Sequence, residues 1–153
     1  MMSIRVLFDE LQRWQWLGIL VGRLAVGLLF FISGRGKVFV SERQQQMQAA
    51  LREAHVPFPE TSAWFVSAVE FVFGLLLMLG ALTPLACIML AGVMAVALAT
   101  TKIGQIKAAS LFDWLGQFLY LPETLYLVIL FWLFLSGPGW LSLDHILFSS
   151  AKF

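Results

Sequence analysis

The chain has 153 residues, of which 60% are hydrophobic and 12% are charged, and its formal net charge is +1. Soluble domains average about 45–50% apolar and about 25% charged residues, so these few charges could not cover the apolar surface of a soluble fold. The balanced charge argues against nucleic acid as a partner, and the single cysteine, Cys87, excludes an internal disulfide and a dithiol relay. The composition therefore predicts an integral membrane protein.

The beginning of the chain predicts an interfacial segment followed by a first span. Residues 2–14 combine charges with tryptophan, which is typical of a segment that lies along the membrane interface, and they lack the cleavage pattern of a signal peptide. A span is predicted at about 15–37, because a bilayer core needs about 20 apolar residues as a helix. Arg23 is its one charge before "SGRGK", where we interpret Arg35 as marking the membrane boundary.

The middle of the chain predicts a polar helix and two closely spaced spans. Residues 41–55 form a polar helical stretch at the interface, and "VPFPE" ends it because its prolines hold the chain extended. Spans are then predicted at about 62–82 and 84–102. The sequence "GALTPLA" divides them, since Pro84 cannot continue a helix and Thr83 can cap the next one.

The last third of the chain predicts a second interfacial segment, a fourth span and a short terminal helix. The interfacial segment is placed at about 104–116, and the span at about 118–136, where "SGPGW" ends it. In the terminal helix, at about 141–149, Ser142 is the expected cap and Asp144 lies in the first turn. Short connections make neighbouring helices antiparallel, so the prediction is one all-α membrane domain, a four-transmembrane-helix antiparallel bundle with amphipathic interfacial segments. The distribution of Lys and Arg leaves its orientation open.

Two charges, Arg23 and Glu70, lie deep in the predicted spans. A charge at mid-depth costs at least about 2.5–3.5 kcal/mol, so it usually faces the bundle interior or a cavity. Arg23 and Lys37 share one stripe of the first span, and Glu70 lies on a matching small and polar stripe of the second. An Arg23–Glu70 pair is therefore expected, either as a structural ion pair or as part of a ligand site. The small residues expected to let the two helices approach are Gly27, Gly34 and Gly74.

A second polar group is predicted where the first and third spans end and the fourth begins. Its members lie at similar depth and indicate a polar vestibule that leads to Glu70; they are Lys37, Thr100, Thr101, Lys102 and Glu123. The alternatives are that its lysines reach toward lipid headgroups, and that Glu123 complements the N-terminus of the fourth span, as Asp144 does in the terminal helix. The candidate ligand-binding residues are Arg23, Lys37, Glu70, Thr101, Lys102 and Glu123, and the candidate structural residues are Asp144, Gly27, Gly34 and Gly74.

Three stretches, taken in order, carry a resemblance to a known family. They are "RLAVGLLFFISGRGKV", "VPFPETSAWFVSAVEFVFGLLLMLGALTPLA" and "SGPGWLSLDHIL", and together they resemble the DoxX family of small four-helix bacterial membrane proteins. The positions that match its motif are Arg23, Lys37, Glu70 and Asp144, whereas "ATTKIGQIKAA" lacks a histidine expected in many relatives. The resemblance implies a multi-pass protein of the bacterial cytoplasmic (inner) membrane. It also implies likeness to the membrane subunit of a thiosulfate–quinone oxidoreductase and to proteins with oxidative-stress partners.

Three functions are compatible with the sequence. The first is an accessory subunit of a redox or oxidative-stress system that binds quinone or a similar amphipathic molecule. The second is a non-catalytic membrane anchor for a soluble oxidoreductase, and the third is a small-molecule transporter that works as a homo-oligomer. No haem, flavin or dithiol signature is present, and His55 and His145 show no ligand spacing, so no metal is expected. No catalytic residue is identified, and whether the chain is an enzyme stays undecided.

Overall fold

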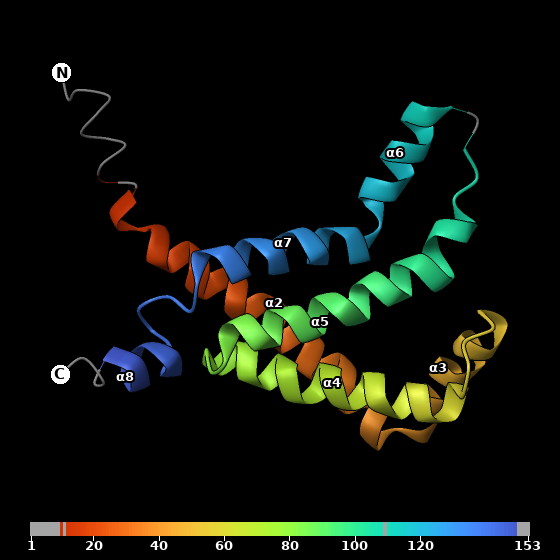
Figure 1. The fold of residues 1–153 in the computed structure, drawn as a ribbon, viewed down its shortest axis with the longest axis horizontal. Coiled ribbons are helices and arrows are strands. Elements are labelled where there is room, and N and C mark those ends of the chain that lie inside the picture. The colour runs from red at the N-terminus through yellow and green to blue at the C-terminus, as the bar shows by residue number, and fades with distance from the viewer. Residues whose placement is uncertain (1–9, 11, 109, 150–153) are drawn as a thin grey trace.

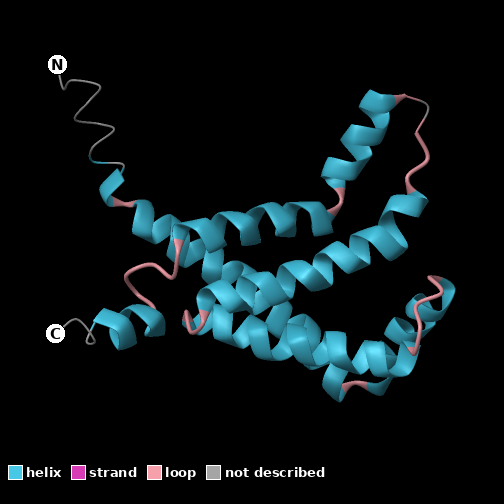
Figure 2. Cartoon of the chain, viewed as in Figure 1, coloured by secondary structure: helices cyan, strands magenta, loops and turns pink. Residues whose placement is uncertain are grey.

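The computed structural model describes residues 10, 12–108 and 110–149, and within these residues the fold contains helices and no strands (Figures 1 and 2). Most of the predicted interfacial segment at 2–14 lies outside the described residues. The elements in chain order are α2 (Gln15–Phe39), α3 (Ser41–Glu53), α4 (Pro59–Leu79), α5 (Thr83–Ala97), a π-helix (Leu98–Lys102), a short 3₁₀ turn (Ile103–Gln105), α6 (Leu111–Tyr120), α7 (Pro122–Ser136) and α8 (Leu143–Ser149).

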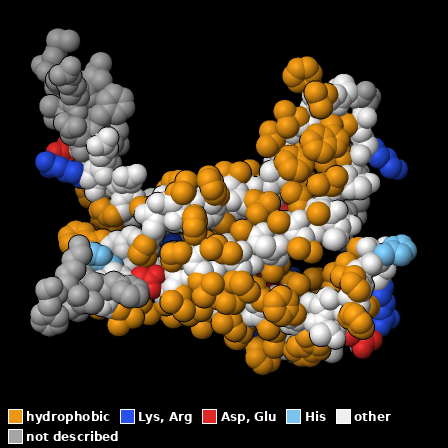
Figure 3. All heavy atoms as spheres, viewed as in Figure 1, with side chains coloured by type: hydrophobic (Ala, Val, Ile, Leu, Met, Phe, Trp, Pro, Cys, Tyr) orange, Lys and Arg blue, Asp and Glu red, His pale blue; other side chains and the backbone are white. Residues whose placement is uncertain are grey.

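Three of the described helices are long and apolar enough to cross a membrane, at Gln15–Phe39, Pro59–Leu79 and Thr83–Thr100. The bent pair of α6 and α7 makes a fourth if it counts as one span. Large apolar side chains cover the visible face of these helices, while charged ones gather toward the ends (Figure 3). Such a surface matches lipid rather than water. The predicted all-α integral membrane protein is confirmed.

The fourth span differs from the prediction of one helix at 118–136. The chain bends by 68° between α6 and α7, and Leu121 between them is extended, with φ −67° and ψ 128°. The bend follows from Pro122, because a proline disfavours helical geometry in the residue before it. As a 15-residue helix, α7 is about 22 Å long, which is less than the roughly 30 Å of a bilayer core.

Glycines bring α2 and α4 into backbone contact along their length. A Cβ added at Gly27 would lie 2.6 Å from the backbone nitrogen of Met78, and one at Gly74 would lie 2.9 Å from the backbone carbon of Phe30. These distances are well below the 3.5–4.0 Å typical of carbon contacts. The predicted small-residue stripes therefore face each other and set the distance between the two helices.

The remaining helices pack around this pair. α5 packs between α4 and α7, and buried apolar side chains of these helices form one cluster with those of α2. α8 and the start of α2 lie at one end of the bundle, which we call the terminal end (Figure 1). α3 and α6 lie at the other end, the loop end. The most completely buried large side chains of the core are Phe30, Leu77, Leu90, Leu130 and Leu133.

Candidate ligand cavity

Glu70 on α4 is bound by two side chains of α2 near the loop end. Lys37 Nζ donates to both carboxylate oxygens, at 2.8 Å to Oε1 and 2.7 Å to Oε2, and Ser33 Oγ donates to Oε2 at 2.9 Å. The Glu70 side chain is 3% exposed and the Lys37 side chain 22%. The negative charge of Glu70 is therefore compensated inside the bundle, as a charge at membrane depth requires.

Gly34 makes this ion pair possible. It lies on α2 between Ser33 and Lys37, and a Cβ added there would stand only 2.8 Å from the carbonyl carbon of Glu70 and 2.7 Å from the Cα of Phe71. The missing side chain lets the α4 backbone approach α2 at the level of Glu70. Ser33 and Lys37 are four residues apart, so they share the helix face that meets it.

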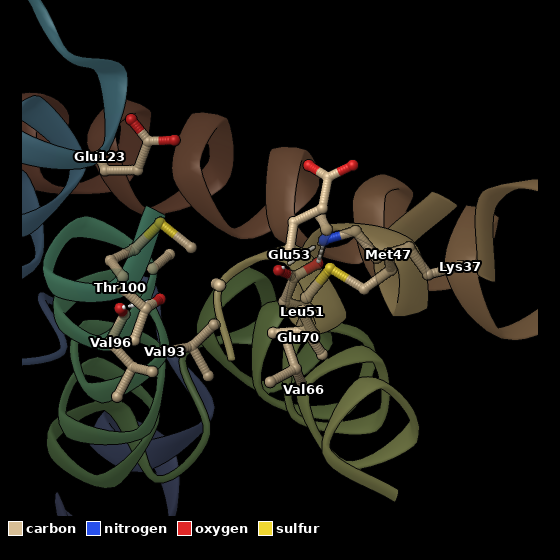
Figure 4. Close-up of a pocket in the computed structure, with 14 residues that line it drawn as sticks. Lys37, Met47, Leu51, Glu53, Val66, Glu70, Val93, Val96, Thr100 and Glu123 are labelled. Atoms are coloured by element: carbon tan, nitrogen blue, oxygen red, sulfur yellow. Dashed lines mark hydrogen bonds and ion pairs between the residues drawn. The ribbon is translucent and has the colours of Figure 1, made fainter. Parts of the chain in front are cut away.

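The ion pair forms one wall of a cavity of about 540 Å³ (Figure 4). Residues of α2, α3, α4, α5, α7 and the π-helix line it, so it lies between these helices at the loop end, where it is partly open. The polar and charged lining residues are Lys37, Glu53, Glu70, Thr100 and Glu123. The apolar lining residues are Met47, Ala50, Leu51, Ala54, Val66, Val93, Met94, Val96 and Ala97.

α3 covers the cavity, although the sequence predicts only that residues 41–55 lie at the interface. Leu51 is buried, and Gln44, also buried, accepts a 3.2 Å hydrogen bond from Ser67 on α4. An exposed ion pair of 2.8 Å between Arg52 and Glu60 adds a second link to α4. These contacts place Met47 and the end of α3 over the cavity (Figure 4).

Thr100 and Glu123 lie on the opposite side of the cavity from Glu70 (Figure 4). Glu123 is in the first turn of α7, directly after Pro122, and it also lines the cavity. Thr100 lies in the π-helix and donates to the backbone oxygen of Val96 at 2.8 Å. Two other predicted residues, Thr101 and Lys102, belong to the same π-helix, but their side chains lie outside the described part of the structure.

Arg23 does not pair with Glu70, so the expected Arg23–Glu70 contact is wrong. Its guanidinium donates from both terminal nitrogens to backbone oxygens of Pro138 and Leu141, which belong to the connection between α7 and α8. The reason is distance along the helix axis. Glu70 contacts α2 at Ser33 and Lys37, which follow Arg23 by ten and fourteen residues, or by about 15 and 21 Å. Arg23 therefore lies at the terminal end and does not line the cavity.

Asp144 also lies at the terminal end, where it caps a helix other than its own. Its carboxylate accepts from the backbone nitrogens of Leu82 at 2.7 Å and Thr83 at 2.8 Å, which begin α5. The hydroxyl of Thr83, expected to form this cap, makes no hydrogen bond within the described residues. Ser142 caps α8 as predicted, accepting from the backbone nitrogen of His145 at 3.0 Å.

Sequence reasoning missed two polar residues of this region, Ser33 and Gln44. Ser33 carried a usable signal, because it precedes Lys37 by one helical turn on the face predicted to point inward. Gln44 lies in a run of glutamines, and nothing in the sequence separates it from its exposed neighbours. Among the described residues, no group of three or more His, Cys, Asp or Glu side chains is arranged to hold a metal ion.

The family model described as DoxX matches residues 18–103, which is more than half of the chain. The chain belongs to the DoxX family. The match includes the Lys37–Glu70 pair, the α3 cover and Arg23, whereas Glu123 and Asp144 lie beyond it. No curated protein and no solved structure matches this DoxX protein. Its apolar helices and its family together identify a multi-pass membrane protein.

Proposed function

We propose that this DoxX protein binds a quinone, or a similar amphipathic molecule with carbonyl or hydroxyl groups, in the cavity beside Lys37 and Glu70. The observation that carries the proposal is a partly open cavity of about 540 Å³ between the helices at the loop end, with mostly apolar walls and one largely buried ion pair. Pockets for small organic ligands typically have about 300–1,000 Å³ and combine apolar walls with a few polar groups that fix orientation.

The ion pair keeps hydrogen-bonding capacity for such a ligand. Lys37 has three N–H groups and uses two of them on Glu70, which leaves one donor for a carbonyl oxygen. The Glu70 carboxylate offers about four acceptor sites and uses three, which leaves one for a hydroxyl. A quinone carbonyl and a quinol hydroxyl would meet the donor and the acceptor respectively, while Met94 and Val93 would contact the ring.

In this proposal the protein is an accessory subunit of a redox or oxidative-stress system in the bacterial cytoplasmic membrane. A soluble oxidoreductase would supply the electron carrier, and this chain would hold and orient the quinone near the membrane surface. The family membership and the cavity support this role. A non-catalytic anchor for such an oxidoreductase is the alternative, and the experiment below distinguishes the two.

The test is the quinone content of the purified protein, measured by solvent extraction and mass spectrometry. We expect about one quinone per chain in the unmodified protein, and a loss of at least about tenfold in Lys37→Ala and in Glu70→Gln, because each removes a polar contact in an apolar site. Glu60→Gln is the matched control, since Glu60 is exposed, pairs with Arg52 and does not line the cavity.

A further variant protects the test against misfolding. Ala50→Phe places a ring at a position of α3 that lines the cavity, so the ring should occupy the space of the ligand. Ala50 is exposed and takes no part in the ion pair, so the pair should remain. It should lose quinone while retaining the unfolding midpoint of the unmodified protein. Equal quinone content in all four variants would refute the proposal. A quinone-free protein that co-purifies with a stoichiometric soluble oxidoreductase would establish the anchor instead.

A further inference from the structure

A second pocket, which we call the outer pocket, shares Lys37 and Met47 with the cavity. Its volume is about 510 Å³, and the other residues that line it are Ser33, Arg43 and Gln46. All of these residues belong to the last turns of α2 or to α3. The pocket therefore lies where a membrane span passes into a polar helix, which is the level of the lipid headgroups.

Arg43 is held against α2 because Gly36 has no side chain. A Cβ at Gly36 would lie 3.1 Å from the Cδ of Arg43 and would overlap its guanidinium. Two other arginines of the described ranges, Arg13 and Arg52, form ion pairs with acids. Arg43 forms no ion pair there, so its charge is available to an external anion.

Arg43 is the uncompensated charge of the outer pocket, because the charge of Lys37 is balanced by Glu70. Lys37 lines both spaces, whereas its partner Glu70 lines only the cavity. The ammonium group thus separates the carboxylate from the outer pocket. Gln46 adds an amide that can donate a hydrogen bond, and Ser33 donates its proton to Glu70. The pocket therefore offers the Arg43 guanidinium and the Gln46 amide beside a lysine that is paired with Glu70, and no carboxylate lines it.

We propose that the outer pocket binds a phosphate group, carried either by an anionic phospholipid or by free phosphate. A guanidinium matches phosphate because two parallel N–H groups meet two oxygens, and such charge-assisted bonds are roughly twice as strong as neutral ones. Basic pockets at the membrane surface are a known way to recognise lipid headgroups. The groups that distinguish this site, Arg43 and Gln46, do not line the cavity, so a phosphate held by them leaves the remaining Lys37 N–H group to the quinone.

The test compares Arg43→Gln with Arg35→Gln, using two probes. Arg35 is an exposed arginine near the end of α2 that does not line the outer pocket, so its substitution removes the same charge outside the site. Phosphatidylglycerol binding is measured by native mass spectrometry against phosphatidylcholine, and inorganic phosphate binding by calorimetry. We expect Arg43→Gln to weaken binding of one probe at least about tenfold and Arg35→Gln to change it less than about twofold.

The probe that depends on Arg43 identifies the source of the phosphate. Selective loss of phosphatidylglycerol binding indicates a lipid headgroup, and selective loss of phosphate binding indicates the free ion. Arg43→Lys keeps the charge without the paired N–H groups and should give an intermediate affinity, which carries the test if Arg43→Gln does not fold. Equal effects of the Arg43 and Arg35 substitutions with both probes, or no binding of either, would overturn the proposal.

Discussion

Gly34→Ala should disrupt the contact between α2 and α4 at the level of the ion pair. The added carbon would stand 2.7 Å from the Cα of Phe71, whereas carbon atoms in contact are about 3.5 Å apart or more. The obstacle is helix backbone, so no side chain can rotate away. The two helices must therefore separate by about 1 Å, which would stretch the 2.7–2.8 Å Lys37–Glu70 bonds beyond hydrogen-bonding distance.

The expected loss of stability follows from three contributions. Overpacking costs about 1–3 kcal/mol. Weakening a hydrogen bond to a charged group costs about 1.5–3 kcal/mol. Alanine stabilises a helix relative to glycine by about 1 kcal/mol, which offsets part of the loss. We therefore expect the free energy of unfolding to fall by about 1.5–5 kcal/mol.

The assay is reversible unfolding in mixed micelles, followed by circular dichroism. Gly92→Ala on α5 is the control, because nothing lies within 4 Å of a Cβ added there. It should leave stability unchanged or raise it by up to about 1 kcal/mol. If Gly34→Ala is as stable as Gly92→Ala, the close α2–α4 contact is not present in the protein and the reasoning fails.

Three further predictions concern the terminal end and the bend. Asp144→Ala removes the acceptor for two backbone amides at the start of α5, so it should lower the free energy of unfolding by about 1–2 kcal/mol. Asp113→Ala, on the exposed α6, is the control and should show a smaller loss. Arg23→Met should speed proteolysis of the α7–α8 connection, because two backbone oxygens lose their donors; unchanged cleavage would contradict this. Pro122→Ala should lengthen the distance between spin labels at the outer ends of α6 and α7, since Leu121 could then become helical; an unchanged distance would show that packing sets the bend.

Features that depend on the residue pattern of a single helix could be predicted from the sequence. Apolar length located the three long apolar helices, and the alignment of Gly27, Gly34 and Lys37 on one stripe correctly identified the face of α2 that meets α4. The inward direction of Lys37 and Glu70 follows from the same periodicity, because a charge at that depth is costly on a lipid-facing surface.

The features that depend on how helices are set against one another were not predictable. A helical wheel gives the face of Arg23 but not the axial level of Glu70, and the level is fixed by backbone contacts at Gly34 and Gly74. Asp144 caps α5 from 61 residues away, so no local pattern distinguishes it from Thr83 as the cap. Such pairings arise only once the whole bundle has packed.

The most direct test of the central claim, a compensated ion pair inside the bundle, is a double-mutant cycle on Lys37 and Glu70. Lys37→Met and Glu70→Met should each lower the free energy of unfolding by about 3–5 kcal/mol, because each leaves a buried charge without its partner. The double variant should lie within about 1–2 kcal/mol of the unmodified protein, since a hydrophobic pair can replace a buried ion pair. Single effects that simply add in the double variant would contradict the account, because they would mean that the two side chains do not meet.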